Sequence, residues 1–449
     1  MTATSVLKWE TLASDISSNI KKLVWGDEVS EEVFLRWTQG LNFTEGEPTA
    51  LIQNSGGPCA VIAPVQSYIL KNLLFTQSES SVVTIDDLKT ISEAGAQKLL
   101  GKSIYDILCN VSHGGNVRLV THWNGSGEDT AGPSTNSDGQ SSQKRPKIFS
   151  IDNFHKELIY KDLALENLED TLDSYVENIM GDFGVLSLLY TTVLTFGLDR
   201  LQPVVEDSGE PLVDPKYGHG GQCLVNLLLT GEGVAEVFDG EQDVGGKKMQ
   251  GISNQSQVGF LTILEAYHIT KVGWNLKSPV YPLWVLASQT HLTVLFTQDE
   301  EALAEDKHSE ALKVINSYDK EGRSFFDSTV LGELMSALGL VSDPGYVDIV
   351  KEKLDPENLG IVFVHSFMEE FFAEDKNEKK ARTFSLCHYN GIKGSNNSNK
   401  IEYHRAEATL KDPQDIAVSI DSSEILKCLQ TKWPTVDLHW AGPGPPSLN

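Results

Sequence analysis

The chain has few cysteines, little basic charge and no long apolar run, and each shortage excludes a class of protein. Five cysteines occur among 449 residues, an odd number widely scattered, so they form neither a disulfide framework nor a CxxC metal knuckle. No apolar run reaches the roughly 18 residues of a membrane-spanning helix. The first residues also lack the basic-then-apolar pattern of a secretory signal. We therefore expect an intracellular protein, cytoplasmic and/or nuclear, with no membrane contact.

Acidic residues outnumber basic residues by 63 to 36, which gives a formal charge of −27. Such a surface repels nucleic acid, so no nucleic-acid partner is expected, and partners with basic faces are favoured. Hydrophobic residues make up 40% of the chain and include eight tryptophans, enough for a large core. The length indicates two or three domains, or one large domain with insertions.

One stretch combines residues that serve nucleophilic chemistry: residues 53–66, which read QNSGGPCAVIAPVQ. Gly56 and Gly57 permit a tight loop and the close approach of a substrate chain. Pro58 suits the first position of a helix, and apolar residues at helical spacing follow. Cys59 is therefore predicted at the N-terminus of a buried helix, where free N–H groups and the helix dipole stabilise a thiolate. We expect its thiol to be exposed.

Gln53 and His291 are the candidate partners of this cysteine. Gln53 lies six residues before Cys59, the spacing with which papain-like enzymes supply an oxyanion donor, and such a donor stabilises the tetrahedral intermediate of carbonyl attack. His291 begins the second of two expected strands, residues 281–287 and 291–296, whose short link predicts a hairpin. A helix with the cysteine, followed by a strand with the histidine, is the papain-like order. No motif identifies a residue that orients His291.

A second cysteine–histidine pair competes for the catalytic role. The Gly-rich loop of residues 214–223 carries His219 and Cys223 just before an expected helix. The alternative interpretation is a packed loop whose Cys223 faces the core. A dinucleotide site is not supported, because the loop lacks a preceding strand and a downstream acidic residue.

Three further segments carry expectations of their own. Residues 124–147 are polar and lack apolar anchors, which predicts a disordered surface insertion. The basic run at its end, residues 144–147, is either a solvated flank or a nuclear signal. Residues 258–269 are expected to form a helix, and the Pro/Gly-rich tail from Gly442 is expected to be frayed.

Residues 300–375 are acidic, helical in pattern, and contain two stretches shaped like calcium loops. These begin at Asp319 and Asp355. A calcium loop needs about six oxygen ligands and a bidentate carboxylate at its twelfth position. The fifth and twelfth positions here hold Arg323 and Val330 in the first loop, and Leu359 and Ser366 in the second. We therefore expect an EF-hand-like pair that folds without metal.

Several short motifs, taken together, resemble the MINDY family of deubiquitinases. They are the 53–66 stretch, Thr290–Val294, Arg36–Gly40, Tyr217–Gly220, His388–Gly391 and Cys428–Pro434, and they span almost the whole chain. The resemblance is greatest to the member with an EF-hand-like insertion. It implies an α+β, papain-like cysteine protease fold. Its catalytic domain would comprise residues 1–299 and 376–449, and residues 300–375 would be the helical insertion.

The same resemblance implies a chemistry and a substrate. Cys59 would be the nucleophile, His291 the general base and Gln53 the oxyanion donor of a hydrolase that cuts isopeptide bonds in lysine-48-linked polyubiquitin. Polyubiquitin and ubiquitinated proteins are the implied partners, a monomer is expected, and no cofactor or metal is implied. Three alternatives stay open: a catalytically silent ubiquitin-chain-binding protein of the same fold, a calcium-responsive interaction protein, and a transglutaminase-type transferase.

Overall fold

The computed structural model describes residues 8–76, 83–122, 150–244, 246–304, 307–318, 324–372, 382–411, 423–442 and 444–449. The expected insertion at 124–147, with its basic run, lies outside the described residues, as do the first five residues of the loop that begins at Asp319. Among the described helices, none has the length and apolar character that a membrane crossing requires.

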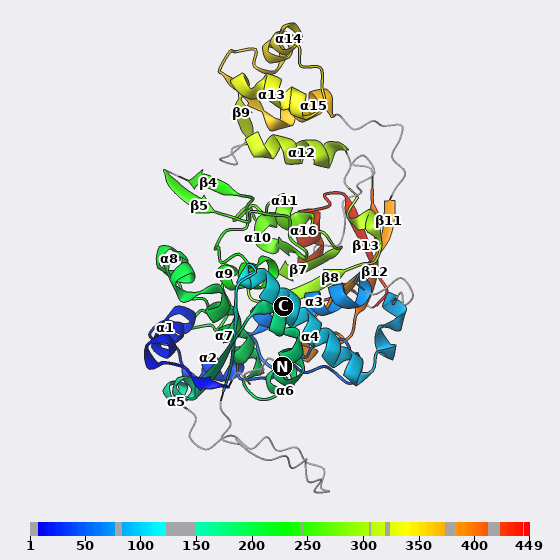
Figure 1. Cartoon of the computed structure of the whole chain (residues 1–449). Coiled ribbons are helices and arrows are strands. Elements are labelled where there is room, and N and C mark those ends of the chain that lie inside the picture. The colour runs from blue at the N-terminus through cyan, green and yellow to red at the C-terminus, as the bar shows by residue number, and fades with distance from the viewer. Residues whose placement is uncertain are drawn as a thin grey trace, which may run out of the picture.

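A mixed six-stranded sheet is the scaffold of the molecule (Figure 1). In order across the sheet, its strands are β13 (Val436–Trp440), β12 (His404–Leu410), β11 (Arg382–Tyr389), β8 (Leu292–Phe296), β7 (Leu283–Ala287) and β6 (Gly259–Thr262). β6 runs parallel to β7, and the other neighbouring pairs are antiparallel. The hairpin predicted from residues 281–296 is confirmed, because β7 pairs with β8.

The two faces of this sheet are buried in different cores. Side chains alternate along a strand, so Val285 packs in the larger core whereas its neighbours Trp284 and Leu286 pack in a smaller one. Helix α3 (Cys59–Leu74) lies against β7 and β8 on the first face. Helices α10 (Ile263–Ala266) and α16 (Glu424–Gln430) cover the second face. The fold is therefore a mixed α+β arrangement with one central buried helix.

Helix α3 is buried at every one of its residues. It packs against β7 and β8, against α4 (Glu93–Ser112) and against α9 (Gln222–Thr230). A helix that is apolar around most of its circumference is stable only inside a core. The predicted buried helix that begins at Cys59 is thus confirmed, and its N-terminal residue is held by packing along the helix behind it.

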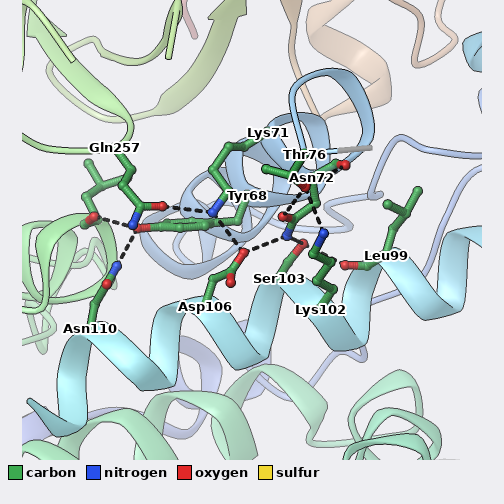
Figure 2. Close-up of polar contacts among 11 residues, drawn as sticks. Tyr68, Lys71, Asn72, Thr76, Leu99, Lys102, Ser103, Asp106, Asn110 and Gln257 are labelled. Carbon is green, nitrogen blue, oxygen red and sulfur yellow. Dashed lines mark hydrogen bonds and ion pairs between the residues drawn. The ribbon is translucent and has the colours of Figure 1, made fainter. Parts of the chain in front are cut away.

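Lys71 and Asn72, two polar residues near the C-terminal end of α3, are paired in the network shown in Figure 2. The ammonium group of Lys71 lies 2.8 Å from the Asp106 carboxylate and 2.8 Å from the side-chain oxygen of Gln257. Asn72 donates to the same carboxylate at 2.8 Å. The Lys71 side chain is only 5% exposed, so these partners replace water, and burial still lowers the Lys71 pKa. The network attaches α3 to α4 and to the segment before β6.

The remaining described elements surround these layers. Strands β1 (Glu10–Thr11), β3 (Leu158–Leu163) and β2 (Val117–His122) form a second sheet, in that order. β4 (Glu241–Val244) and β5 (Lys247–Gln250) form a separate hairpin. The other helices are α1 (Ser14–Trp25), α2 (Glu31–Arg36), α5 (Ile151–Lys156), α6 (Glu169–Met180), α7 (Gly184–Phe196), α8 (Leu198–Ser208) and α11 (Trp274–Lys277).

Residues 307–372 form a unit with its own core at one end of the molecule (Figure 1). Its elements are α12 (Lys307–Tyr318), β9 (Phe325–Asp327), α13 (Leu331–Ala337), α14 (Pro344–Leu354), β10 (Ile361–Phe363) and α15 (Val364–Phe371). β9 and β10 pair antiparallel, with Phe326 opposite Val362. The two chain segments that lead to the unit meet where the Arg382 guanidinium donates to the Ala304 carbonyl at 3.1 Å.

Two expectations about local structure are wrong. Residues 258–269 form a strand, β6, followed by one helical turn, α10, and not a continuous helix. The tail is not frayed, because Leu448 is 2% exposed and packs in the smaller core. β6 is buried on both faces, so its apolar run lacks the alternation that distinguishes a strand from a helix.

The Lys71 network yields a stability prediction. Asp106→Ala should lower the free energy of unfolding by about 3 kcal/mol, because removing one partner of a buried ion pair leaves the other charge uncompensated. Lys102→Ala is the matched control, because this exposed lysine on the same helix contacts only the Thr76 hydroxyl in the network shown; it should change the value by less than about 0.5 kcal/mol. Urea denaturation measures both, and equal effects would contradict the network's role.

Candidate active site

The loop before α3 is shaped by one glycine and one close loop–loop contact. Gly57 has φ +123°, and a Cβ there would lie 2.6 Å from the Gly218 carbonyl oxygen and 2.9 Å from the Trp37 indole nitrogen. That indole donates to the same carbonyl at 3.0 Å. Gly57 is therefore required by both backbone conformation and space. A Cβ on Gly56 would meet nothing within 4 Å, so its side faces open space beside the loop.

Cys59 is the first residue of α3, as expected, but its thiol is buried and not exposed. The residue is 3% exposed, and Sγ donates to the Gly57 carbonyl at 3.6 Å. Burial raises the pKa of the thiol to about 11, although backbone hydrogen bonds, the largest from Leu292, act in the opposite direction. Burial therefore opposes the thiolate that the sequence predicts, because desolvating a charge costs free energy that the helix terminus must offset.

His291 lies directly before β8, so it is adjacent in the chain to Leu292, whose backbone contacts the Cys59 sulfur. A four-residue turn presents it: Ser288 N–H donates to the His291 carbonyl at 2.9 Å, and His291 N–H donates to Ser288 Oγ at 2.9 Å. The ring is buried, and burial lowers its pKa to about 4 against the opposing effect of Asn390. His291 is therefore neutral at pH 7, the form that can accept a proton.

Asn390 is a site residue that the sequence did not identify. It follows β11 directly, and its Oδ1 lies 3.1 Å from His291 Nε2. Because an amide oxygen only accepts, Nε2 carries the hydrogen and Nδ1 keeps its lone pair. The pairing of β11 with β8 brings the two residues together. The available signal was the polar pair Asn390-Gly391 at the end of a strand, inside a motif that had no assigned role.

Gln53 also lies at this place, held through its backbone. Its N–H donates to the Gly391 carbonyl at 2.8 Å, so the loop before α3 is attached to the residue after Asn390. Its side chain is 3% exposed and donates from Nε2 to the Ser55 carbonyl at 2.8 Å. The amide that was predicted as an oxyanion donor thus has another acceptor in this structure.

The competing pair, His219 and Cys223, separates into two different environments. Cys223 packs in the larger core, and burial raises its pKa to about 12. His219 lies in the loop that contacts Gly57, its ring stacks on exposed Tyr217, and it is close enough to His291 to lower that residue's pKa. Burial lowers the His219 pKa as well. His219 is therefore a neighbour of the site, whereas Cys223 is a core residue.

Contacts thus bring Gln53, Cys59 and His291 to one place, between the start of α3 and the ends of β8 and β11. A thiol that contacts the backbone of Leu292, and the imidazole of the preceding residue oriented by an amide, are groups that suit attack on a carbonyl with proton transfer. Within the described ranges, no group of three or more histidine, cysteine, aspartate or glutamate side chains could hold a metal ion.

Comparison with known proteins identifies the family. The conserved domain described as "Deubiquitinating enzyme MINDY-3/4" matches residues 21–324. The chain belongs to the MINDY-3/4 family of deubiquitinating enzymes. It is 41% identical over 453 residues to the ubiquitin carboxyl-terminal hydrolase MINDY-3 of Homo sapiens, covering 97% of this chain and 100% of that protein. The resemblance read from the motifs is therefore confirmed.

Other MINDY-3/4 relatives show how the similarity is distributed. The MINDY-3 homologue of Drosophila melanogaster is 38% identical over 472 residues, which cover 96% of this chain and 82% of that protein. The probable ubiquitin carboxyl-terminal hydrolase MINDY-4 of Xenopus tropicalis is 30% identical over 303 residues, 64% of this chain and 37% of that protein. No solved structure matches the chain.

The buried histidines predict how stability depends on pH. Burial lowers the pKa of His155 and His291 to about 4 and that of His388 to about 3, from 6.5. The unfolded chain therefore binds protons below pH 6.5 that the folded chain does not, so stability falls as pH drops from about 6.5 towards 4. Each group should cost about 2 kcal/mol between pH 7 and pH 5.

Urea denaturation at pH 7, 6 and 5 tests this dependence. His388→Gln removes one of these titrating groups. The free energy of unfolding of this variant should therefore fall less steeply between pH 7 and pH 5 than that of the wild type. A free energy of unfolding that is flat between pH 7 and pH 5 would show that these rings are accessible to protons in the folded chain.

Proposed function

We propose that the chain hydrolyses isopeptide bonds in lysine-48-linked polyubiquitin through a papain-like centre of Cys59, His291 and Gln53. The single observation that carries the proposal is the 3.1 Å contact between His291 Nε2 and Asn390 Oδ1. It leaves Nδ1 as the basic nitrogen of a residue whose neighbour, Leu292, contacts the Cys59 sulfur. Membership of a deubiquitinating family supports the substrate, and the Gly57 loop suits the narrow Gly-Gly end of ubiquitin.

The starting protonation states of Cys59 and His291 determine the order of the proton transfers. Because thiol and imidazole are both neutral, His291 removes the thiol proton as Sγ bonds to the isopeptide carbonyl carbon. The resulting imidazolium then protonates the departing lysine amine. Water, deprotonated by His291, then attacks the thioester carbonyl. As the C–S bond breaks, the imidazolium returns its proton to the Cys59 sulfur, and the ubiquitin C-terminus leaves as a carboxylic acid that ionises in water. The Cys59 N–H and the Gln53 amide would stabilise each oxyanion, and Gln53 must first exchange its Ser55 contact for the substrate oxygen.

The proposal extends to the organisation of the whole chain. Residues 1–299 and 376–449 would form the catalytic domain, and residues 300–375 the EF-hand-like insertion. Polyubiquitin and ubiquitinated proteins would be the partners of a monomer that works in the cytoplasm and/or the nucleus. The strongly acidic surface favours encounter with the basic rim of ubiquitin's recognition face.

A catalytically silent ubiquitin-chain-binding protein is the second candidate. Two observations favour it: burial raises the Cys59 pKa to about 11, and the Gln53 amide is engaged by Ser55. Both describe a centre that is not arranged for attack without substrate. Incubating the wild type with lysine-48-linked and lysine-63-linked chains of several lengths separates the candidates, because a silent binder retains chains without cutting them.

Variants of the three proposed residues should differ in a defined order. Cys59→Ala should abolish cleavage, and His291→Ala should be nearly as damaging, because the two act as a unit. Gln53→Ala should retain a trace of activity, with turnover lower by about 10²–10³-fold. His219→Ala is the matched histidine control. An active His291→Ala together with an inactive His219→Ala would show that the wrong base was chosen.

An electrophile at the ubiquitin C-terminus tests the nucleophile directly. It should label Cys59, because recognition of ubiquitin places the reactive carbon beside that sulfur. Labelling mapped by mass spectrometry should spare the other four cysteines: Cys109, Cys223, Cys387 and Cys428. Labelling centred on Cys223 would overturn the assignment.

The insertion is proposed to be an ordered module that binds no calcium under cellular conditions. In its second loop, Asp355 is 6% exposed, and its carboxylate accepts from the backbone N–H groups of Leu359 at 2.7 Å and Gly360 at 2.8 Å. The first-position carboxylate is thus used within the loop. The fifth residue, Leu359, and the twelfth, Ser366, offer no carboxylate, although a calcium loop needs a bidentate carboxylate at its twelfth position.

Calorimetric titration with calcium should therefore show no binding tighter than about 10 μM, the range of sensor sites. The double variant Leu359→Asp/Ser366→Glu restores carboxylates at the fifth and twelfth positions. It should bind calcium more tightly than the wild type does if the loop has EF-hand geometry. Tight binding by the wild type would make the insertion a calcium switch.

A further inference from the structure

Residues 444–449 are packed onto the candidate active site. Leu448 is 2% exposed and belongs to the smaller core, together with Ile425 and Leu429 of α16. Pro446 is also buried, whereas Pro445 is exposed. Asn449 Nδ2 donates to the Glu424 carboxylate at 3.1 Å. Apolar burial therefore anchors the segment, and this anchoring presents the polar groups of Ser447 and Asn449 to their neighbours.

One set of contacts reaches the turn that presents His291. Asn449 Oδ1 accepts from Ser288 Oγ at 2.6 Å and from Thr290 Oγ1 at 3.2 Å. Ser288 Oγ in turn accepts from the backbone N–H of His291 at 2.9 Å. The Asn449 amide thus closes a short chain of hydrogen bonds that ends on the backbone of the proposed base.

A second set of contacts reaches Asn390, the residue that orients the His291 ring. Asn390 Nδ2 donates to the Ser447 carbonyl at 3.2 Å and to the Asn449 carbonyl at 3.4 Å. Asn390 Oδ1 accepts from Ile392 N–H at 3.0 Å, in addition to facing His291 Nε2. Both ends of the amide therefore meet groups that cannot exchange roles, since carbonyls only accept and N–H groups only donate.

We propose that residues 447–449 are a positioning segment that selects the tautomer of His291. The Ser447 and Asn449 carbonyls hold Nδ2 of Asn390 towards them, so Oδ1 faces His291. An oxygen there requires the ring hydrogen on Nε2 and leaves the Nδ1 lone pair for the Cys59 proton. A rotated amide would present Nδ2 instead, which favours hydrogen on Nδ1 and removes the base. This inference rests on the proposed role of His291.

The effect should lie in turnover and not in substrate binding. Where an orienting residue of a catalytic histidine is replaced so that the wrong tautomer results, turnover falls by as much as about 10⁴-fold. Residues 447–449 act through Asn390, and Ile392 still holds Oδ1. We therefore expect a smaller loss, on the order of 10–100-fold in kcat, with KM changed less than about 2-fold.

Two variants displace the segment by different means. One ends the chain at residue 443, and the other, Leu448→Asp, places a charge where Leu448 is buried. Pro445→Ala is the matched control, since that residue is exposed and none of the contacts above involves it. Thermal melting and retention of lysine-48-linked chains on immobilised protein establish that each variant is folded and binds substrate. Equal kcat in all four proteins would overturn the proposal.

A double-mutant cycle with Asn390→Ala separates positioning from general stability. If the segment acts through Asn390, displacing it should lower kcat by less than 2-fold in the Asn390→Ala background. A merely structural segment would lower kcat by the same factor in both backgrounds, and that result would also overturn the proposal.

The ring of His291 gives a readout that needs no activity. Histidine-selective ¹⁵N spectra, with His291 assigned by a His291→Gln variant, should show the Nε2–H tautomer in the wild type and a mixture in the displaced variants. An unchanged tautomer would overturn the proposal. If the wild type cuts no ubiquitin chain, the proposed function fails, yet this spectrum still decides whether residues 447–449 select the tautomer.

Discussion

Helix α3 is enclosed by the six-stranded sheet on one side and by α4 and α9 on others, and this enclosure decides where Cys59 lies. A helix buried at every residue cannot slide or rotate without opening voids, because protein interiors pack at crystal-like density. Lys71 and Asn72 of α3 are paired inside the protein with Asp106 and Gln257, so the helix need not turn them towards solvent. The position of the sulfur relative to β8 therefore follows from core packing, which extends many residues away from the chemistry.

The same enclosure works against the reactivity of the cysteine. A thiolate is stabilised by N–H groups at the start of a helix, yet these groups act over a few ångströms, whereas desolvation acts from every side. In this chain desolvation is the larger effect, and it raises the pKa of the Cys59 thiol. The two glycines of the loop differ in their surroundings. Gly56 borders open space, whereas Gly57 is packed so closely that no side chain would fit there.

The parts of the site that the sequence predicted are those with a local cause. The Gly-Gly-Pro-Cys loop and the hairpin at residues 283–296 are encoded by turn residues and by short apolar strands, so both were predictable. The role of Asn390 was not predictable, because it depends on the pairing of β11 with β8, two strands that are far apart in the sequence. The burial of Leu448 was not predicted, because a Pro/Gly-rich composition is typical of a frayed tail. In the structure Leu448 packs in the smaller core, together with residues of α16 and the sheet. β6 was predicted as part of a helix, because a strand buried on both faces lacks the alternation of apolar and polar residues that identifies a strand.

The hydrogen bond between Arg382 and Ala304 has a consequence for how residues 307–372 are connected to the sheet. It joins the segment that leaves β8 to the first residue of β11, and these two strands are antiparallel neighbours. Replacing the unit by a short connection would therefore leave two adjacent strands that an ordinary turn could join. The order of the strands in the sheet is thus independent of what the chain holds between Ala304 and Arg382.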